Sequence, residues 1–79
     1  MRNSKHHSKS RYQVVTYHSI ENGFDEKKEY PTLKEAASVA SGYVEGTVEP
    51  DGFVYEGAAV YDLQKKKYLR IFGHFPIDS

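Results

Sequence analysis

The chain has 79 residues, of which 38% are hydrophobic and 28% charged, and its formal net charge at neutral pH is zero. A chain this short can bury only one small core, and its lack of cysteine excludes disulfides, thiolate nucleophiles and cysteine-based zinc sites. No apolar run approaches the roughly 18 residues that a membrane-spanning helix needs. No apolar signal segment follows the basic start either, so we expect a cytoplasmic protein.

The neutral total hides an uneven distribution of charge. Residues 1–20 carry four basic side chains and no acid, residues 21–64 carry ten acids against three lysines, and residues 65–79 carry four basic side chains against one acid. A dedicated nucleic-acid-binding protein usually has a basic isoelectric point, whereas this one is 6.9. Binding of a polyanion by the whole surface is therefore disfavoured, although a local basic patch stays open.

The N-terminal segment differs in composition from the rest of the chain. Residues 1–10 contain a single apolar side chain, that of Met1, and cannot offset their ordering entropy by burial. They are predicted to form a disordered basic tail, and residues 11–79 a single small domain.

The first half of this domain has the pattern of a hairpin. Residues 12–20 are rich in β-branched and aromatic side chains, which favour a strand. Asn22 and Gly23 form the dipeptide most typical of a type I′ turn. Residues 24–30 then return as a second strand, and its five consecutive charged residues fit only the edge of a sheet.

A capping box predicts the one helix. Thr32 can accept a hydrogen bond from the amide of Glu35, whose side chain can reach back to the amide of Thr32. Apolar residues recur at helical period from there to residue 45, and Gly46 follows at the usual position for a left-handed C-terminal residue. Residues 49–52, Glu-Pro-Asp-Gly, then predict a tight turn.

Two more strands are predicted, at residues 53–62 and 67–75, joined by the polar residues 63–66. Gly57 marks either a β-bulge or a close approach of another backbone. The order β-β-α-β-β gives an α+β domain, in which a four-stranded antiparallel sheet carries one amphipathic helix on one face. One helix covers only that face, so the other is expected to meet solvent, a partner or a second copy.

Strand alternation assigns side chains to the two faces. For the first strand it leaves open whether Val14 or Val15 points to the helix. The predicted core consists of Leu33, Ala36, Ala37, Ala40, Tyr43, Val44, Val54, Val60, Leu69 and Ile71. The predicted binding residues on the open face are Tyr55, Tyr61, Tyr68, Arg70, Phe72 and His74.

These aromatic side chains favour a non-catalytic binding domain that takes a protein partner, or a second copy of itself, through the open face. The alternative is single-stranded nucleic acid stacked on the same rings, with help from the basic tail. Tyrosine also suits exposed strand positions with no binding role at all. A candidate basic patch is formed by Lys65, Lys66 and Lys67, although lysines at a hairpin tip usually do no more than discourage edge pairing.

Catalytic signals are weak. His18 and His74 are the only histidines outside the tail, and a metal-free nuclease using either one is the weakest of the hypotheses. We find no nucleophile elbow, phosphate loop or metal-ligand spacing in the sequence. The sequence therefore predicts no catalytic residue, no metal site and no cofactor, and it favours a protein that is not an enzyme.

A family resemblance extends over about residues 11–76. It rests on Tyr30 to Ala36, Glu49 to Ala58, Tyr61 with Asp62, and Tyr68 to Gly73. In these stretches the chain resembles short proteins of Gram-positive bacteria, some of them carried on mobile genetic elements, to which no activity is assigned. The resemblance implies a free-standing bacterial cytoplasmic domain and brings no functional residues with it.

Overall fold

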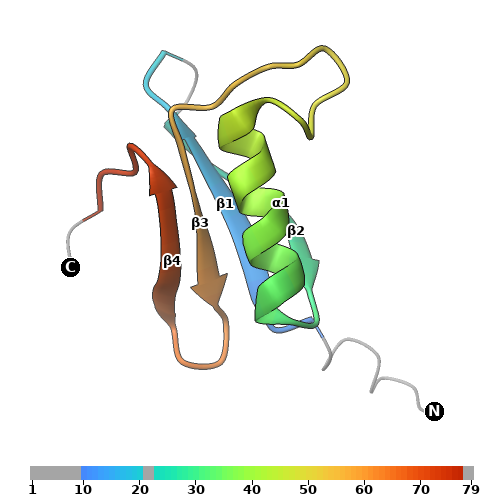
Figure 1. The fold of residues 1–79 in the computed structure, drawn as a ribbon. Coiled ribbons are helices and arrows are strands. Elements are labelled where there is room, and N and C mark those ends of the chain that lie inside the picture. Colours follow the sequence, from blue (N-terminus) through green and yellow to red (C-terminus); the bar gives the residue numbers. More distant parts are fainter. Residues whose placement is uncertain (1–9, 21–22, 78–79) are drawn as a thin grey trace.

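The structure, a computed structural model, describes residues 10–20 and 23–77. Its four strands are β1 (Tyr12–His18), β2 (Gly23–Tyr30), β3 (Gly57–Asp62) and β4 (Lys67–Gly73), and its helix is α1 (Leu33–Glu45). The strands form one antiparallel sheet in the order β2-β1-β3-β4, and α1 packs on one face of it, mainly against the central strands β1 and β3 (Figure 1). This confirms the predicted α+β class and the edge position of the charged strand β2. Residues 1–9 of the predicted N-terminal tail and Asn22 of the predicted turn lie outside the described residues.

The helix begins and ends where the sequence signals place it. The Thr32 hydroxyl accepts a hydrogen bond from the Glu35 amide at 3.2 Å, which is one half of the predicted capping box. Gly46 adopts φ 82°, and its amide donates to the carbonyl of Gly42. A left-handed residue at this position is accessible to glycine at little cost, because glycine has no Cβ to clash with the preceding turn. The described helix is too short and too polar to cross a membrane.

Three predicted strand ends are wrong. β1 ends at His18 instead of residue 20, β3 begins at Gly57 instead of residue 53, and β4 ends at Gly73 instead of residue 75. Residues 53–56 cross from the end of the helix to the sheet as irregular chain, anchored where the Tyr55 amide donates to the carbonyl of Tyr43. The Glu56 amide donates to the carbonyl of Tyr17 in β1, and the Glu56 carbonyl accepts a hydrogen bond from the His74 amide. These residues are thus held by the helix, by the end of β1 and by the segment after β4.

The helix-side core is a cluster of buried small and aromatic side chains. Its members are Val14, Ala36, Ala40, Tyr43, Ala58 and Val60. Val14 is therefore the residue of the first strand that points to the helix, and Val15 points away. Three predicted core residues are wrong, and for two of them the exposure is large, 53% for Val54 and 45% for Ile71. Leu69 is half-buried and lies outside the core.

The opposite face of the sheet carries a second, smaller cluster. Val15, Ala59 and Phe75 are buried there, and Tyr17, Tyr61, Tyr68 and Ile77 pack against them. Phe75 and Ile77 belong to the segment after β4, which turns back at Gly73 (φ 67°) and runs over this face. The expectation that the second face meets only solvent or a partner is therefore wrong in part, because the chain covers some of it with its own C-terminal segment.

Gly57 is where this segment makes its closest approach to the sheet. A Cβ at Gly57 would overlap the carbonyl of His74 and lie 3.0 Å from the amide nitrogen of Phe75. Of the two predictions for Gly57, close backbone approach is confirmed. The irregularity in the β3–β4 pairing lies further along, between Val60 and Tyr61.

A buried ion pair closes the β3–β4 hairpin. Asp62 is fully buried, and its two carboxylate oxygens accept hydrogen bonds from the Arg11 guanidinium at 3.0 and 2.9 Å. The same carboxylate accepts hydrogen bonds from the backbone amides of Gln64 and Lys65 in the turn. These bonds, led by that from Arg11, lower the pKa of Asp62 to about 2. The carboxylate thereby joins the start of the domain to the hairpin turn.

Candidate functional site

The candidate site is a groove on the sheet face opposite α1, with a volume of about 660 Å³. It is lined by Gln13, Val15, Phe24, Asp25, Glu26, Tyr61 and Tyr68, which come from β1, β2, β3 and β4, and we call it the sheet-face groove. Its volume lies within the range of small-ligand pockets, and it combines aromatic walls with a few polar groups, as binding sites commonly do.

A β-bulge in β4 decides which side chains reach this groove. Val60 pairs with Arg70, but the next residue, Tyr61, pairs with Tyr68, so Leu69 is an extra residue on β4. Residues that pair directly across an antiparallel ladder point to the same face. Tyr68 therefore lies beside Tyr61 on the groove face, whereas Arg70 follows Val60 to the helix side.

Two of the six predicted binding residues meet in the groove. The rings of Tyr61 and Tyr68 have centroids 4.9 Å apart and planes inclined at 69°, so that they form two walls of a corner. Phe75 supports this corner from the C-terminal segment, 5.3 Å from the Tyr68 ring and 5.1 Å from that of Phe24. Partial burial raises the pKa of Tyr68, and electrostatic interaction with Tyr61 and then with Glu26, which lines the same groove, raises it further.

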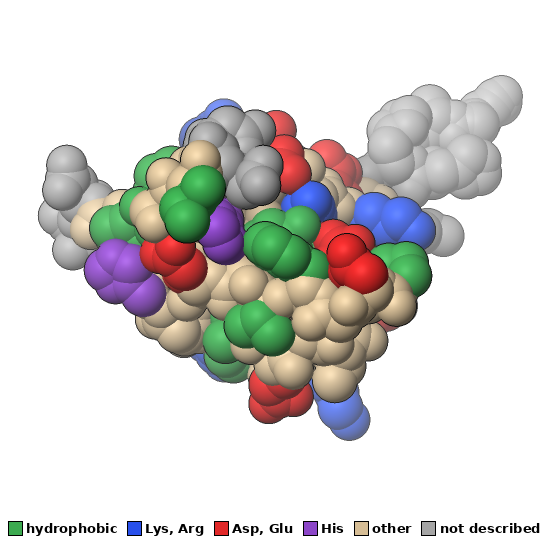
Figure 2. All heavy atoms as spheres, turned by 90° about the horizontal axis from the view of Figure 1, so that it is seen from above, with side chains coloured by type: hydrophobic (Ala, Val, Ile, Leu, Met, Phe, Trp, Pro, Cys, Tyr) green, Lys and Arg blue, Asp and Glu red, His purple; other side chains and the backbone are tan. Residues whose placement is uncertain are grey.

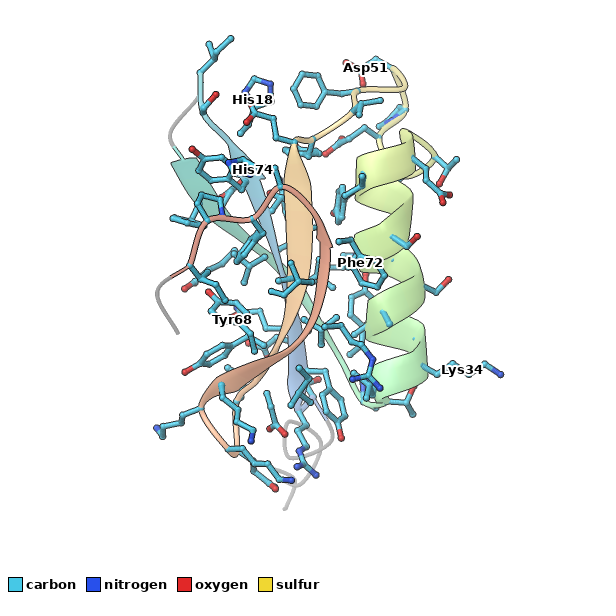
Figure 3. All side chains as sticks on the ribbon, turned by 60° about the vertical axis from the view of Figure 1, so that its left-hand side comes forward. His18, Lys34, Asp51, Tyr68, Phe72 and His74 are labelled. Atoms are coloured by element: carbon cyan, nitrogen blue, oxygen red, sulfur yellow. The ribbon has the colours of Figure 1, made fainter. Side chains whose placement is uncertain are left out.

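Three predicted binding residues lie on the helix side, which is a correction. Phe72 packs against the helix-side core, and Figure 3 shows Phe72 and Tyr68 pointing to opposite sides of β4. Tyr55 precedes β3, and its ring lies edge-on to that of Tyr43. Arg70 is exposed, and its guanidinium donates to the carbonyl of Leu69 at 2.8 Å. The bulge turns the side chains of Arg70 and Phe72 to the face opposite the one that unbroken alternation predicts. Tyr55 was assigned to the wrong face because the chain before Gly57 is irregular and is not part of a strand.

His74 follows β4 and lies outside the groove, exposed, with its ring edge-on to Tyr17 at 5.8 Å. It stands at the end of the molecule that Figure 2 shows, where both described histidines lie among acidic and hydrophobic side chains. Nearby, the Glu56 carboxylate accepts hydrogen bonds from the hydroxyl and amide of Ser19, which lower the pKa of Glu56. His18 and His74 lower it further through their charge. Within residues 10–20 and 23–77, no three histidines or carboxylates are placed to hold a metal ion.

The predicted basic patch occupies the β3–β4 hairpin tip. Lys65, Lys66 and Lys67 are all exposed, and the register pairs Lys67 with Asp62 on the helix side. Lys66 has φ 58°, in the left-handed region that favours glycine. None of the three lines the sheet-face groove.

A second cavity, of about 350 Å³, lies on the helix side at the loop end of the sheet. Its carboxylates already have partners in the chain. The carboxylate of Asp25 forms an ion pair with the Lys27 ammonium at 2.8 Å. The Glu49 carboxylate accepts a hydrogen bond from the Tyr55 hydroxyl at 3.0 Å, and that of Asp51 accepts one from the backbone amide of Phe53 at 3.0 Å. These carboxylates therefore stabilise the loops around the cavity, and we do not take the cavity as the candidate site.

Sequence reasoning missed several residues of the groove. Phe24 and Glu26 could have been found, because they alternate on β2 and pair with Tyr17 and Val15. Phe75 carried no such signal, because only the folded C-terminal segment brings it over the sheet.

A comparison of the chain with models of known protein families, with curated proteins and with solved structures finds no match.

Proposed function

We propose that the protein is a non-catalytic binding domain that takes a protein partner through the sheet-face groove. The observation that carries this proposal is the aromatic corner of Tyr61 and Tyr68 in a groove of about 660 Å³. Tyrosines are enriched among the residues that dominate protein interfaces, because they bury a large rigid surface at low entropic cost. A partner side chain inserted into this corner would gain contact with both rings.

The charge of the groove face favours a protein over nucleic acid. By strand register, Glu26 and Glu29 of β2 lie opposite Val15 and Gln13 on this face, and Lys27 and Lys28 fall in the irregularity between them, opposite Val14. Arg70, the one arginine among the predicted binding residues, follows Val60 to the helix side. Phosphates would meet carboxylates beside the rings, where like charges repel.

Peptide display on the immobilised full chain tests this proposal. Selected peptides should bind the wild type, lose most of their affinity for Tyr68→Leu, and retain it for Ile71→Ala. The second variant is the matched control, because Ile71 lies on the same face but outside the groove lining. A mass in sedimentation that rises with concentration for the wild type and not for Tyr68→Leu would identify the partner as a second copy.

Two results would overturn the proposal. One is a selection in which no peptide distinguishes the wild type from Tyr68→Leu, together with a monomeric mass at every concentration. The other is an amide NMR titration in which single-stranded oligonucleotides shift the groove residues and still do so at physiological salt, where non-specific phosphate attraction is strongly weakened.

A further inference from the structure

The helix side of the sheet contains a cation held by two tyrosines and a carboxylate. The rings of Tyr43 and Tyr55 lie 5.3 Å apart with planes inclined at 88°. The Lys27 ammonium lies 5.8 and 5.3 Å from their centroids and 2.8 Å from the carboxylate of Asp25. The hydrogen bond with Asp25 is the largest of the effects that raise the pKa of Lys27. Both distances to the ring centroids are within the range of cation–π interactions, so the two rings and the carboxylate together stabilise the positive charge.

The sheet-face groove repeats two parts of this arrangement on the opposite face. Tyr61 and Tyr68 form a second tyrosine pair with a similar separation, 4.9 Å, and a similar inclination, 69°. The carboxylate is that of Glu26, the neighbour of Asp25 on β2, and successive residues of a strand point to opposite faces. Glu26 lines the same groove as Tyr61 and Tyr68, and its charge is one of the effects that raise the pKa of Tyr68.

The third part, the cation, is missing from the groove. Its lining contains no lysine or arginine among the residues that the structure describes. The ion pairs found in that part of the chain join Arg11 to Asp62 and Lys27 to Asp25, so neither engages Glu26. The groove thus offers two aromatic walls and a carboxylate to a positive charge supplied from outside.

We infer that the sheet-face groove binds an arginine or lysine side chain from a peptide segment of the protein partner, in the corner formed by the rings of Tyr61 and Tyr68 and against Glu26. This inference rests on the proposed function and adds the charge of the partner segment. The positive group gains the ring faces and the carboxylate together, while its aliphatic stem lies along Val15 and Phe24 in the same groove.

Paired peptides test the charge directly. The probes are an octapeptide of alternating arginine and serine, and the same peptide with citrulline, the uncharged isostere, at each arginine. They are titrated into the isotopically labelled full chain and followed by amide NMR at physiological salt. We expect the arginine peptide to shift the groove residues and to bind about tenfold more tightly than the citrulline peptide, as a desolvated cation–π contact with a carboxylate allows.

Variants assign the effect to the groove. Glu26→Gln should weaken the arginine peptide by about three- to tenfold and leave the citrulline peptide nearly unchanged, whereas Tyr68→Leu, which removes a wall of the groove, should weaken both. Glu45→Gln is the control, because it removes the same charge from an exposed position on α1. A loss of affinity in Glu45→Gln equal to that in Glu26→Gln would show general attraction to the acidic surface and overturn the inference.

The remaining outcomes separate this inference from the proposed function. If the arginine and citrulline peptides shift the groove residues with equal affinity, the groove binds peptides but does not select charge, and only the inference fails. If neither peptide shifts the groove while display yields groove-binding peptides that lack basic residues, the inference again fails alone. If neither peptide binds and display yields no groove-dependent peptide, both fail.

Discussion

Removal of the Phe75 ring is the most direct test of how the C-terminal segment contributes to the fold. The side chain is only 6% exposed and belongs to the buried cluster on the groove face. Its ring lies edge-on to those of Phe24 and Tyr68. Phe75→Ala therefore removes the anchor of the segment and one support of the aromatic corner.

The expected loss in the free energy of unfolding can be calculated from the surface that Phe75 buries. A phenylalanine ring that buries about 150 Å² contributes about 4 kcal/mol at 25 cal/mol per Å². Release of one or two backbone residues beside the missing ring would return about 1 kcal/mol of entropy for each, so the net loss is about 1–2 kcal/mol smaller than the surface alone indicates. We expect Phe75→Ala to lower the free energy of unfolding by about 2–3 kcal/mol, a large part of the roughly 3–5 kcal/mol available to a domain of this size.

Urea denaturation followed by circular dichroism measures this loss. With a slope near 1 kcal/mol per molar urea for so small a protein, the midpoint should fall by about 2–3 M. Phe24→Ala is the control, because 47% of that residue is already exposed and its removal takes only about half as much surface out of burial. A free energy of unfolding for Phe75→Ala within about 0.5 kcal/mol of the wild type, the range of ordinary surface substitutions, would refute the reasoning.

Three further changes test local features in the same assay. Lys66→Gly should raise the free energy of unfolding by about 0.5–1 kcal/mol, because Lys66 adopts φ 58° where glycine is relaxed. Gly46→Ala should lower it by about 1–2 kcal/mol, because the residue has φ 82° and its new Cβ would lie 2.8 Å from Cγ2 of Val54. The pKa of Asp62 falls from 3.8 to about 2 on folding, so this carboxylate stabilises the fold above about pH 4 and loses that effect as the pH falls toward 2. Asp62→Asn should therefore destabilise the protein at neutral pH and flatten the decline of its stability between pH 4 and 2.

Each of these expectations has a contrary result. Destabilisation by Lys66→Gly would mean that the lysine makes contacts worth more than its backbone strain. A neutral Gly46→Ala would mean that the end of the helix relaxes without cost. An unchanged acid profile in Asp62→Asn would assign the acid sensitivity to other carboxylates, of which Glu56, with its lowered pKa, is one.

The parts of the fold that could be predicted depend on short-range interactions. The limits of α1 follow from Thr32 and Gly46, which act within one helical turn, and the turn at residues 49–52 is closed by a bond from the Gly52 amide to the carbonyl of Glu49. The edge position of β2 follows from its run of charges, which can be seen without knowing any partner strand.

Side-chain direction in the strands could not be predicted to the same extent, because it depends on pairing. Val14 and Val15 are chemically alike, and only the packing of β1 between β2 and β3 decides which one meets the helix. Tyr55 looked like a strand residue by composition, yet its amide donates to the carbonyl of Tyr43 in the helix. Phe75 follows the last strand and reaches the groove face only because the chain turns back at Gly73.

The bulge at Leu69 shows how much chemistry one unpaired backbone position can decide. Strand periodicity is two, so one extra residue reverses the face of everything beyond it. If the alternation ran unbroken from Tyr68, Arg70 would join that tyrosine on the groove face and place a guanidinium near Glu26. The bulge keeps Tyr68 beside Tyr61 and sends Arg70 to the other side. The groove therefore has Tyr61 and Tyr68 beside Glu26 without the guanidinium of Arg70, and our inference that it takes a cationic group, and not an anionic one, rests on this arrangement.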